Sequence, residues 1–383
     1  MSKYSDKIVI TTGDPNGIGA EITIKALAKL NLPPDKVVII SNRKILEYYS
    51  DVWMSGGMDV WQFNNSCVGE IQHEPQTGNS YTSIPLYLHT SAYELLEIPY
   101  NAEIEPGKVT KEAGEFSFRS VKLACEIGAK AIVTAPVAKN AMHLAGHNFN
   151  GQTEILQKYL AHDNQLAEML FVAGNFRVLL LTRHVPLKEI NLTKDMVVEK
   201  ISNLKEFFVS HLGINDPKFA LCGFNPHSGE DGILGREEIE ILQPAVEELR
   251  AKGINITSPL PADTLFVGAA REYMEGWRAG GLEVRLFNSS NIDKTSQEQQ
   301  TDNSYTSMPP YLHTSKYDCY IANYHDQGLI PIKIVAGDKT VNMTIGLDII
   351  RTSPGHGTAF DIAGKNIADE TGMIEAIKAV LKT

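Results

Sequence analysis

Residues 8–21 read IVITTGDPNGIGAE and join a short β-type run, 8–12, to a glycine-rich turn that opens an amphipathic segment, 20–30. The same alternation continues along the chain. Short apolar runs occupy 36–41, 131–134, 177–182, 218–222 and 317–322, and amphipathic segments occupy 113–128 and 237–251. Strands that alternate with helices predict an α/β fold with largely parallel sheets and flanking helices. Ligands of such sheets gather outside the carboxyl ends of the strands.

The turn itself, Gly13 to Gly19, has two interpretations. Its glycines allow a tight turn and bring backbone N–H groups close to a ligand at the start of a helix. The spacing differs from the G-x-G-x-x-G of dinucleotide-binding turns, however. A plain strand-to-helix connection is therefore an equal alternative.

The composition is that of an ordinary globular protein, with 43% hydrophobic and 21% charged residues in 383 positions. This length predicts two domains. A formal net charge of −11 argues against partners such as nucleic acid or an anionic membrane surface, but a local basic pocket for an anionic metabolite is compatible with it. The chain shows no signal-peptide pattern and no apolar run long enough for a membrane helix. Its four scattered cysteines fit the reducing cytoplasm.

Two near-copies interrupt the alternation. Residues 76–93 read QTGNSYTSIPLYLHTSAY, and residues 300–317 read QTDNSYTSMPPYLHTSKY. Because the flanking sequences do not repeat, we interpret both as insertions, near 70–93 and near 275–315. The polar composition of 288–303 predicts a surface loop or local disorder. His89 and His313, inside the copies, are therefore poor ligand candidates.

Three histidines stand in unusual contexts: His184 in TRHVPL, His227 in NPHSGE and His325 in YHDQGL. Each follows an apolar run, so three imidazoles could surround one divalent cation and leave positions open for a substrate. The alternative is that each satisfies its hydrogen bonds separately in a loop or in the core. Asp326 offers a carboxylate that orients His325 or binds the ion directly, and Asp263 adds another in a turn-like setting.

Lys333, Asn342 and Arg351 place two cations and an amide in the last third of the chain. Such groups suit a phosphate monoester, and ordinary surface charge is the alternative. Lys139 ends an apolar strand and is either a functional or a solvated lysine. Thr153 is either a ligand-binding residue or a helix N-cap.

In combination these motifs resemble the 4-hydroxythreonine-4-phosphate dehydrogenase family of pyridoxine biosynthesis, which is related to the isopropylmalate and isocitrate dehydrogenases. They occur in the family's order as GDPNGIG, TAPVAK, HVPL, NPHSGE, LPADT, YHDQG and RTSPGHGTAFDIAGK. The resemblance implies a homodimer with its active site at the interface. It also implies a first α/β domain formed by 1–133 plus 335–383, which carries the cofactor loop, and a second formed by 134–334.

The implied reaction is the oxidation of the 3-hydroxyl of 4-phosphooxy-L-threonine with NAD or NADP, followed by decarboxylation to 3-amino-2-oxopropyl phosphate. The implied residue roles cover the metal, the substrate, the cofactor and proton transfer. They are a Zn, Mg or Co ion on His184, His227 and His325; substrate on Gln152, Thr153, Lys333, Asn342 and Arg351; cofactor on His356, Gly357, Thr358 and Ala359; and proton transfer by Asp263, Asp326 or Lys333.

Two positions depart from the family's pattern. Gln152 stands where the family has His, and Gly355 stands where Asp is expected before His356. A paralogue that acts on phosphorylated threonate or erythronate therefore remains an alternative. A metal-dependent hydrolase or lyase that uses the same three histidines is a rival from the enzyme class. A metabolite-binding protein without turnover is a rival from another class.

Overall fold

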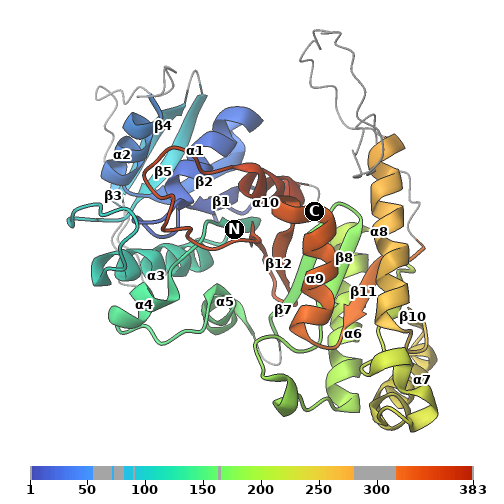
Figure 1. The fold of residues 1–383 in the computed structure, drawn as a ribbon. Coiled ribbons are helices and arrows are strands. Elements are labelled where there is room, and N and C mark those ends of the chain that lie inside the picture. Colours follow the sequence, from blue (N-terminus) through green and yellow to red (C-terminus); the bar gives the residue numbers. More distant parts are fainter. Residues whose placement is uncertain are drawn as a thin grey trace, which may run out of the picture.

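The computed structural model describes residues 2–54, 71–72, 82–88, 91–162, 165–279 and 316–381. These residues form one sheet of thirteen strands in the order β10-β9-β11-β8-β7-β12-β13-β6-β1-β2-β5-β4-β3, covered by helices (Figure 1). The strands are β1 (Ile8–Thr11), β2 (Val37–Ser41), β3 (Ile71–Gln72), β4 (Thr82–Leu88), β5 (Ser91–Glu97), β6 (Ala131–Thr134), β7 (Glu168–Ala173), β8 (Phe176–Leu180), β9 (Lys218–Leu221), β10 (Asn255–Ile256), β11 (Cys319–Ala322), β12 (Val341–Ile345) and β13 (Ile350–Pro354).

The helices are α1 (Gly19–Leu30), α2 (Arg43–Met54), α3 (Lys111–Glu126), α4 (Lys139–Leu144), α5 (Gln152–Leu160), α6 (Lys194–Leu212), α7 (Gln243–Ala251), α8 (Ala262–Ala279), α9 (His325–Ala336) and α10 (Thr371–Leu381). Each predicted apolar run thus overlaps a strand. The predicted amphipathic segments overlap α1, α3 and α7. The predicted α/β fold is confirmed.

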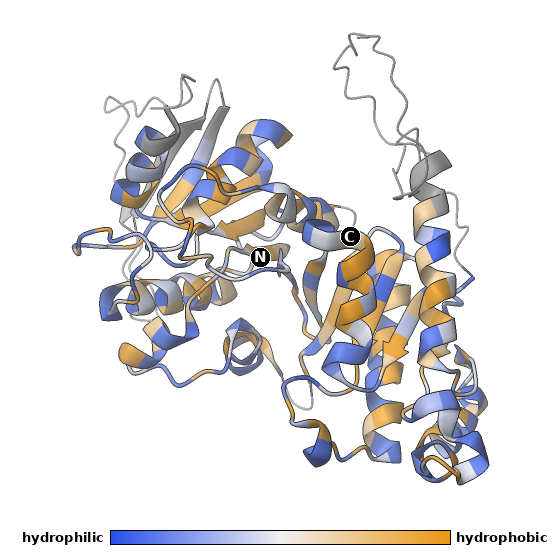
Figure 2. Cartoon of the chain, viewed as in Figure 1, coloured by the Kyte–Doolittle hydropathy of each residue, from blue (hydrophilic) through white to orange (hydrophobic). Residues whose placement is uncertain are grey.

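The strands of the sheet concentrate the hydrophobic residues (Figure 2). β1 pairs in parallel with β2 and with β6, and all their side chains are buried. Strands that are buried on both faces read as continuous apolar runs, which explains why these were visible in the sequence. None of the described helices is long and apolar enough to cross a bilayer.

Strands β12 and β13 form an antiparallel pair in the middle of the sheet. β12 pairs antiparallel with β7, and β13 pairs parallel with β6. Hydrogen bonding between strands therefore continues across the predicted domain boundaries at 133/134 and 334/335. The division of the chain into two domains at these positions stays a prediction.

The turn after β1 packs against three other loops. Gly13 has φ 71°, and a Cβ there would lie 2.2 Å from the carbonyl oxygen of Pro136, so only glycine fits. The N–H of Asp14 donates to Pro136 O, and the N–H of Ile18 donates to Thr358 O (3.0 and 3.1 Å). The Asn16 side chain donates to the carbonyl oxygen of Lys108. The protein thus satisfies the Ile18 N–H itself, which favours the structural interpretation of this turn.

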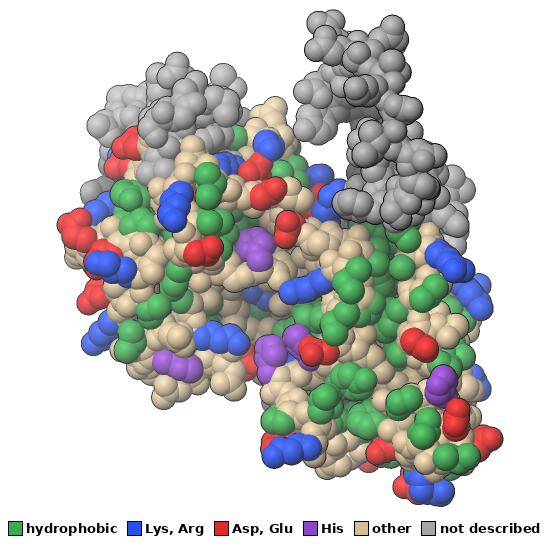
Figure 3. All heavy atoms as spheres, viewed as in Figure 1, with side chains coloured by type: hydrophobic (Ala, Val, Ile, Leu, Met, Phe, Trp, Pro, Cys, Tyr) green, Lys and Arg blue, Asp and Glu red, His purple; other side chains and the backbone are tan. Residues whose placement is uncertain are grey.

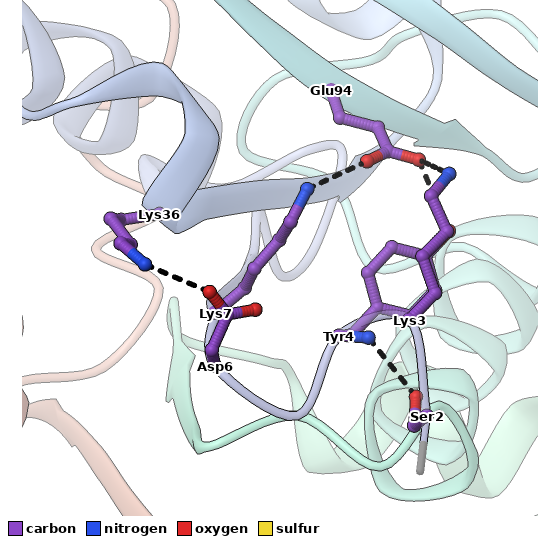
Figure 4. Close-up of polar contacts among 7 residues, drawn as sticks. All are labelled: Ser2, Lys3, Tyr4, Asp6, Lys7, Lys36 and Glu94. Atoms are coloured by element: carbon purple, nitrogen blue, oxygen red, sulfur yellow. Dashed lines mark hydrogen bonds and ion pairs between the residues drawn. The ribbon is translucent and has the colours of Figure 1, made fainter.

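The first near-copy takes part in the sheet, because residues 82–88 and 91–93 lie in strands β4 and β5, and its interpretation as an insertion stays a prediction. β5 pairs in parallel with β2. Tyr93 is fully buried and donates to the carbonyl oxygen of Leu32. The carboxylate of Glu94 accepts from Lys3, Tyr4 and Lys7 of the N-terminal segment (Figure 4). His89, and residues 280–315 with most of the second near-copy, lie outside the described residues.

Candidate active site

A cavity of about 350 Å³ lies over the central strands. Its floor comes from alternate residues of three neighbouring strands, because side chains at i and i+2 point to the same face. These residues are Met169 and Phe171 of β7, Asn342 of β12, and Arg351 and Ser353 of β13. Asn342 is directly opposite both Phe171 and Ser353. Histidine, lysine and arginine side chains surround a hollow on the visible face of the molecule (Figure 3).

Helix α9 supplies one wall. His325, Leu329 and Lys333 follow each other at i, i+4 and i+8, so they share one helical face, and all three line the cavity. On the side of the helix that packs against the sheet, a Cβ at Gly328 would lie 2.7 Å from Leu180 of β8. Glycine at this position therefore lets α9 lie directly against the sheet.

The start of α9 is fixed by the glutamine of the YHDQG motif. The Gln327 Oε1 accepts from the backbone N–H of Asn323 (2.7 Å), and its Nε2 donates to the carbonyl oxygen of Gly223 (2.8 Å). These bonds tie the helix start to the ends of β11 and β9. The motif thus positions His325 in addition to providing it.

His184 and His325 approach each other in the cavity, with ring centroids 5.4 Å apart. His325 Nδ1 lies 2.7 Å from a carboxylate oxygen of Asp326, which leaves Nε2 for a ligand. Burial lowers the pKa of His184, and the charges of Lys139 and His325 lower it further. A neutral imidazole is the form that binds a metal ion.

His227 does not line this cavity. It is exposed in the segment Pro226–Gly232, where its backbone is left-handed (φ 51°). Among the described residues, no three His, Cys, Asp or Glu side chains lie close enough to hold a metal ion. Within one chain, two of the three predicted ligands thus approach each other, and the predicted three-histidine site is not assembled among the described residues.

The predicted proton-transfer residues also lie partly inside and partly outside the cavity. Lys333 lines the cavity, and its Nζ donates to the carbonyl oxygen of Gly355 (3.3 Å). Asp326 is exposed beside the cavity and contacts His325. Asp263 is exposed in the first turn of α8 and is absent from the cavity lining. Of the three, only Lys333 is positioned to reach a bound ligand within one chain.

The cavity is cationic although the chain is acidic. Lys139, Arg183, Lys333 and Arg351 line it, with Glu154 as the carboxylate among the lining residues. Arg351 is almost completely buried, and its Nε and Nη2 donate to Thr134 Oγ1 (2.8 and 2.6 Å). Burial lowers the pKa of Arg351 to about 10, so the residue remains a cation at neutral pH. Buried cations of this kind suit an anionic ligand.

Two amide oxygens of the lining residues are buried without a described partner. They belong to Gln152 and Asn342. The Gln152 Nε2 donates to the carbonyl oxygen of Ala135 (3.2 Å), and this bond fixes which end of the amide is the free acceptor. A ligand hydroxyl or ammonium group would satisfy both oxygens, since buried polar atoms are normally paired.

Thr153 is buried and lines the cavity in the first turn of α5. The N-cap of that helix is Gly151, so the N-cap interpretation of Thr153 is wrong.

Only part of the predicted cofactor loop lines the cavity, namely His356 and Gly357. Thr358 packs against Gly17 and accepts from Ile18 instead, and Ala359 has a left-handed backbone (φ 43°). A Cβ at Gly355 would lie 2.6 Å from the carbonyl oxygen of Thr340, so the expected Asp would not fit at this position of the present backbone. A second cavity of about 320 Å³ adjoins the first and shares Lys333, Gly355 and His356 with it.

Arg183, Glu154 and Ser353 also line the cavity, although they are not among the residues predicted from the sequence. Arg183 was detectable because it precedes His184 directly after β8. Glu154 and Ser353 occupy ordinary contexts, and only the folded chain reveals their position.

A sequence profile described as "Pyridoxal phosphate biosynthetic protein PdxA" matches residues 34–380. The chain belongs to this family. A 4-hydroxythreonine-4-phosphate dehydrogenase from a Sulfurihydrogenibium species is 34% identical over 383 residues, which cover 98% of this chain and 97% of the relative. The D-threonate 4-phosphate dehydrogenase of Salmonella typhimurium is 31% identical over 380 residues, with 98% of each chain covered. The family resemblance inferred from the motifs is thus confirmed.

Solved structures agree with this membership. The crystal structure of a 4-hydroxythreonine-4-phosphate dehydrogenase from Klebsiella pneumoniae matches with a TM-score of 0.73 at 30% identity, covering 99% of this chain and 98% of the other. A terephthalate dihydrodiol dehydrogenase from Burkholderia xenovorans shares the fold, with a TM-score of 0.56 at 22% identity over 98% of this chain and 97% of the other. This PdxA-family chain is accordingly an oxidoreductase of α/β fold.

Proposed function

We propose that the protein oxidises the 3-hydroxyl of 4-phosphooxy-L-threonine with NAD or NADP in pyridoxal phosphate biosynthesis. Loss of CO₂ from the resulting 3-oxo acid would give 3-amino-2-oxopropyl phosphate. The observation that carries this proposal is one cavity in which two imidazoles approach each other near the buried cation of Arg351, with Lys139, Arg183 and Lys333 also in its lining. An anionic substrate with an oxidisable hydroxyl fits this combination.

Arg351 and Lys333 bind the phosphate in this proposal. The guanidinium of Arg351 is held by Thr134, so it is oriented before the substrate arrives. Asn342 Oδ1 and Gln152 Oε1 accept from the substrate's hydroxyl or ammonium group, and Thr153 lies beside them. The loop from His356 to Ala359 is proposed to contact the cofactor near the second cavity.

His184 and His325 would hold a divalent ion such as Zn, Mg or Co. A bound ion would lower the pKa of the substrate hydroxyl and polarise the ketone that forms from it. Asp326 orients the His325 ring through Nδ1. Lys333, Asp326 and Asp263 stay the candidates for proton transfer.

The incomplete metal site leads us to propose a homodimer that completes it. The loops that carry the histidines expose apolar side chains, with Leu187 at 68%, Ile233 at 80% and, on α9, Ile334 at 78% exposure. The face over α8 and α9 shows hydrophobic side chains in Figure 3. Apolar surface of this kind marks an interface. In the dimer, His227 and the neighbouring Asp263 of one copy would reach the cavity of the other.

A reducing cytoplasm fits the cysteines, because Cys125, Cys222 and Cys319 are buried and unpaired. Burial raises the pKa of Cys125 to about 12, so its thiol is unreactive there.

Spectroscopic detection of nicotinamide reduction tests the activity. The purified protein is assayed with NAD and with NADP on 4-phosphooxy-L-threonine after metal analysis. We expect metal-dependent formation of the reduced cofactor. Turnover without cofactor reduction would support a hydrolase or lyase, and binding without turnover would support a metabolite-binding protein.

Phosphorylated threonate is the second candidate substrate, because the departure at Gln152 is compatible with it. This residue replaces the histidine that the family resemblance implied, and the Salmonella relative is named for D-threonate 4-phosphate. Threonate carries a hydroxyl where threonine carries an ammonium group, and a neutral amide oxygen accepts from either. The ratio of kcat/KM for the two substrates decides between them.

A further inference from the structure

We propose that Arg183 binds the carboxylate of the substrate, at a second anion subsite apart from Arg351 and Lys333. The inference rests on the proposed function, in which the substrate carries a phosphate at one end and a carboxylate at the other. It adds a specificity-determining residue to that function.

The strand ends fix the position of Arg183. The N–H of Leu181 donates to Ala322 O (2.8 Å), and Thr182 donates to Asn323 O through both its N–H (3.2 Å) and its hydroxyl (2.7 Å). Arg183 follows at once and lines the cavity beside His184. A rigid strand end gives a binding residue a defined position.

One nitrogen of Arg183, Nη1, is fully buried and has no hydrogen-bond partner among the described residues. Buried donors are normally satisfied, and an unmet bond from a charged group is costly. Glu168 is near enough for the charge of Arg183 to act on it, but its carboxylate pairs with Lys200 and does not accept from this nitrogen. A ligand that enters the cavity is the natural partner of this nitrogen.

A carboxylate fits better than a second contact to the phosphate. Arg351 and Lys333 come from β13 and from the third turn of α9, whereas Arg183 adjoins His184. In 4-phosphooxy-threonine the oxidised carbon lies between the phosphate-bearing carbon and the carbon that bears the amino and carboxylate groups. With the oxidised carbon at the two histidines, the carboxylate falls on the side of Arg183. The planar guanidinium matches a carboxylate in a bidentate manner.

Calorimetric binding to wild type and Arg183→Gln tests this assignment without any turnover. The ligands are 4-phosphooxy-L-threonine and its carboxamide, which keeps the phosphate and hydroxyl but loses the carboxylate charge. We expect wild type to prefer the acid by about ten- to a hundredfold, as for a charge-assisted hydrogen bond. Arg183→Gln should lose this preference while its affinity for the carboxamide stays unchanged. Arg236→Gln, at an exposed position, is the matched control.

The melting temperature separates binding from a structural role. Since Nη1 has no described partner in the free protein, Arg183→Gln should melt no lower than wild type. Three results would overturn the assignment. The variant could still prefer the acid, it could lose affinity for both ligands equally, or it could melt several degrees lower than wild type. Phosphorylated threonate and its carboxamide are measured in parallel. If wild type binds only this pair, the proposed substrate is wrong, and the preference for acid over amide still decides the role of Arg183.

Discussion

His184 and His325 enter one cavity from neighbouring strands, and their rings lie 5.4 Å apart. His184 follows β8 and His325 follows β11, and these two strands pair in parallel. Parallel neighbours end at the same edge of a sheet, so pairing alone brings both residues together. His227 follows β9, the other neighbour of β11, but its side chain is exposed outside the cavity.

Mixing two inactive variants tests whether His227 acts on the partner's cavity. His227→Ala and His325→Ala should each lose metal-dependent turnover, because a three-ligand ion loses one donor. If each site uses His325 of one copy and His227 of the other, a hybrid dimer contains one intact site. Random re-association should then restore about a quarter of wild-type activity, because half of the dimers are hybrids with one of two sites intact.

The control for this experiment is the double variant His227→Ala/His325→Ala mixed with either single variant, which should stay inactive. Far-UV circular dichroism should be unchanged in all variants, since a catalytic ligand is not required for folding. Absence of recovery in verified hybrid dimers would place all three ligands in one chain, or remove His227 from the site.

Arg351→Lys should weaken the binding of phosphate although it keeps the positive charge. Lysine cannot reproduce the planar fork that donates to Thr134 Oγ1 through Nε and Nη2. We expect an increase in the KM of the phosphorylated substrate, and in the Ki of inorganic phosphate, of about tenfold or more.

Thr134→Val is the matched control for Arg351, because it removes the acceptor and keeps the guanidinium. Its effect on the Ki of phosphate should be smaller than that of Arg351→Lys. Equal Ki values in all three proteins would show that Arg351 is structural and does not contact the phosphate.

The sequence predicted the parts of the fold that depend on local patterns. β1, β2 and β6 are buried on both faces and were visible as apolar runs. β4 and β5 were missed because the repeated sequence suggested an insertion, whereas Tyr93 and Glu94 of β5 bind residues far away in the chain, Leu32 and Lys3.

Some residues of the site could likewise be predicted from local patterns, and others could not. His325 and Lys333 share a helical face that a periodicity argument can find, and Arg351 stood out by its charge. The unpaired Nη1 of Arg183 arises only when β8 and β11 end side by side. The number of residues between two motifs in the sequence does not predict the distance between strands that are remote in the chain. For the same reason, the sequence could not show that His227 lies outside the cavity that His184 and His325 share within one chain.

Gln152→His should introduce an ionisable group into the site. The imidazole can keep the donor bond to Ala135 O but replaces a neutral acceptor oxygen with a nitrogen that titrates near neutral pH. We expect the profile of kcat/KM against pH to gain an ionisation between about pH 6 and 7, with lower activity on the acidic side for a substrate that needs an acceptor.

Gln152→Leu, which lacks both functions, should lower kcat/KM at every pH without this added ionisation. A Gln152→His profile that is superimposable on that of wild type would mean that the side chain makes no contact with the substrate.

Asp14 should make the protein less stable as the pH rises from about 4 to about 6. Burial raises the pKa of Asp14 to about 6, against backbone donors that lower it, and its Oδ2 has no partner among the described residues. The folded state therefore binds this proton more tightly than the unfolded state, where the pKa is about 3.9. The stabilisation is fully present below the unfolded pKa of about 3.9 and is lost progressively as the pH rises from there through the folded pKa of about 6. Between pH 4.5 and 7.5 the loss amounts to about 2 kcal/mol.

Urea unfolding of wild type and Asp14→Asn at both pH values measures this term. The variant keeps an oxygen that can accept from the Asn16 N–H but cannot ionise, so its free energy of unfolding should lack this fall of about 2 kcal/mol. Asp51→Asn makes the same chemical change at an exposed position and should retain the wild-type pH dependence. Parallel curves for wild type and Asp14→Asn would show that Asp14 has the same proton affinity in the folded and unfolded states, so that its burial between the turn and Ala138 is relieved by another group or by solvent.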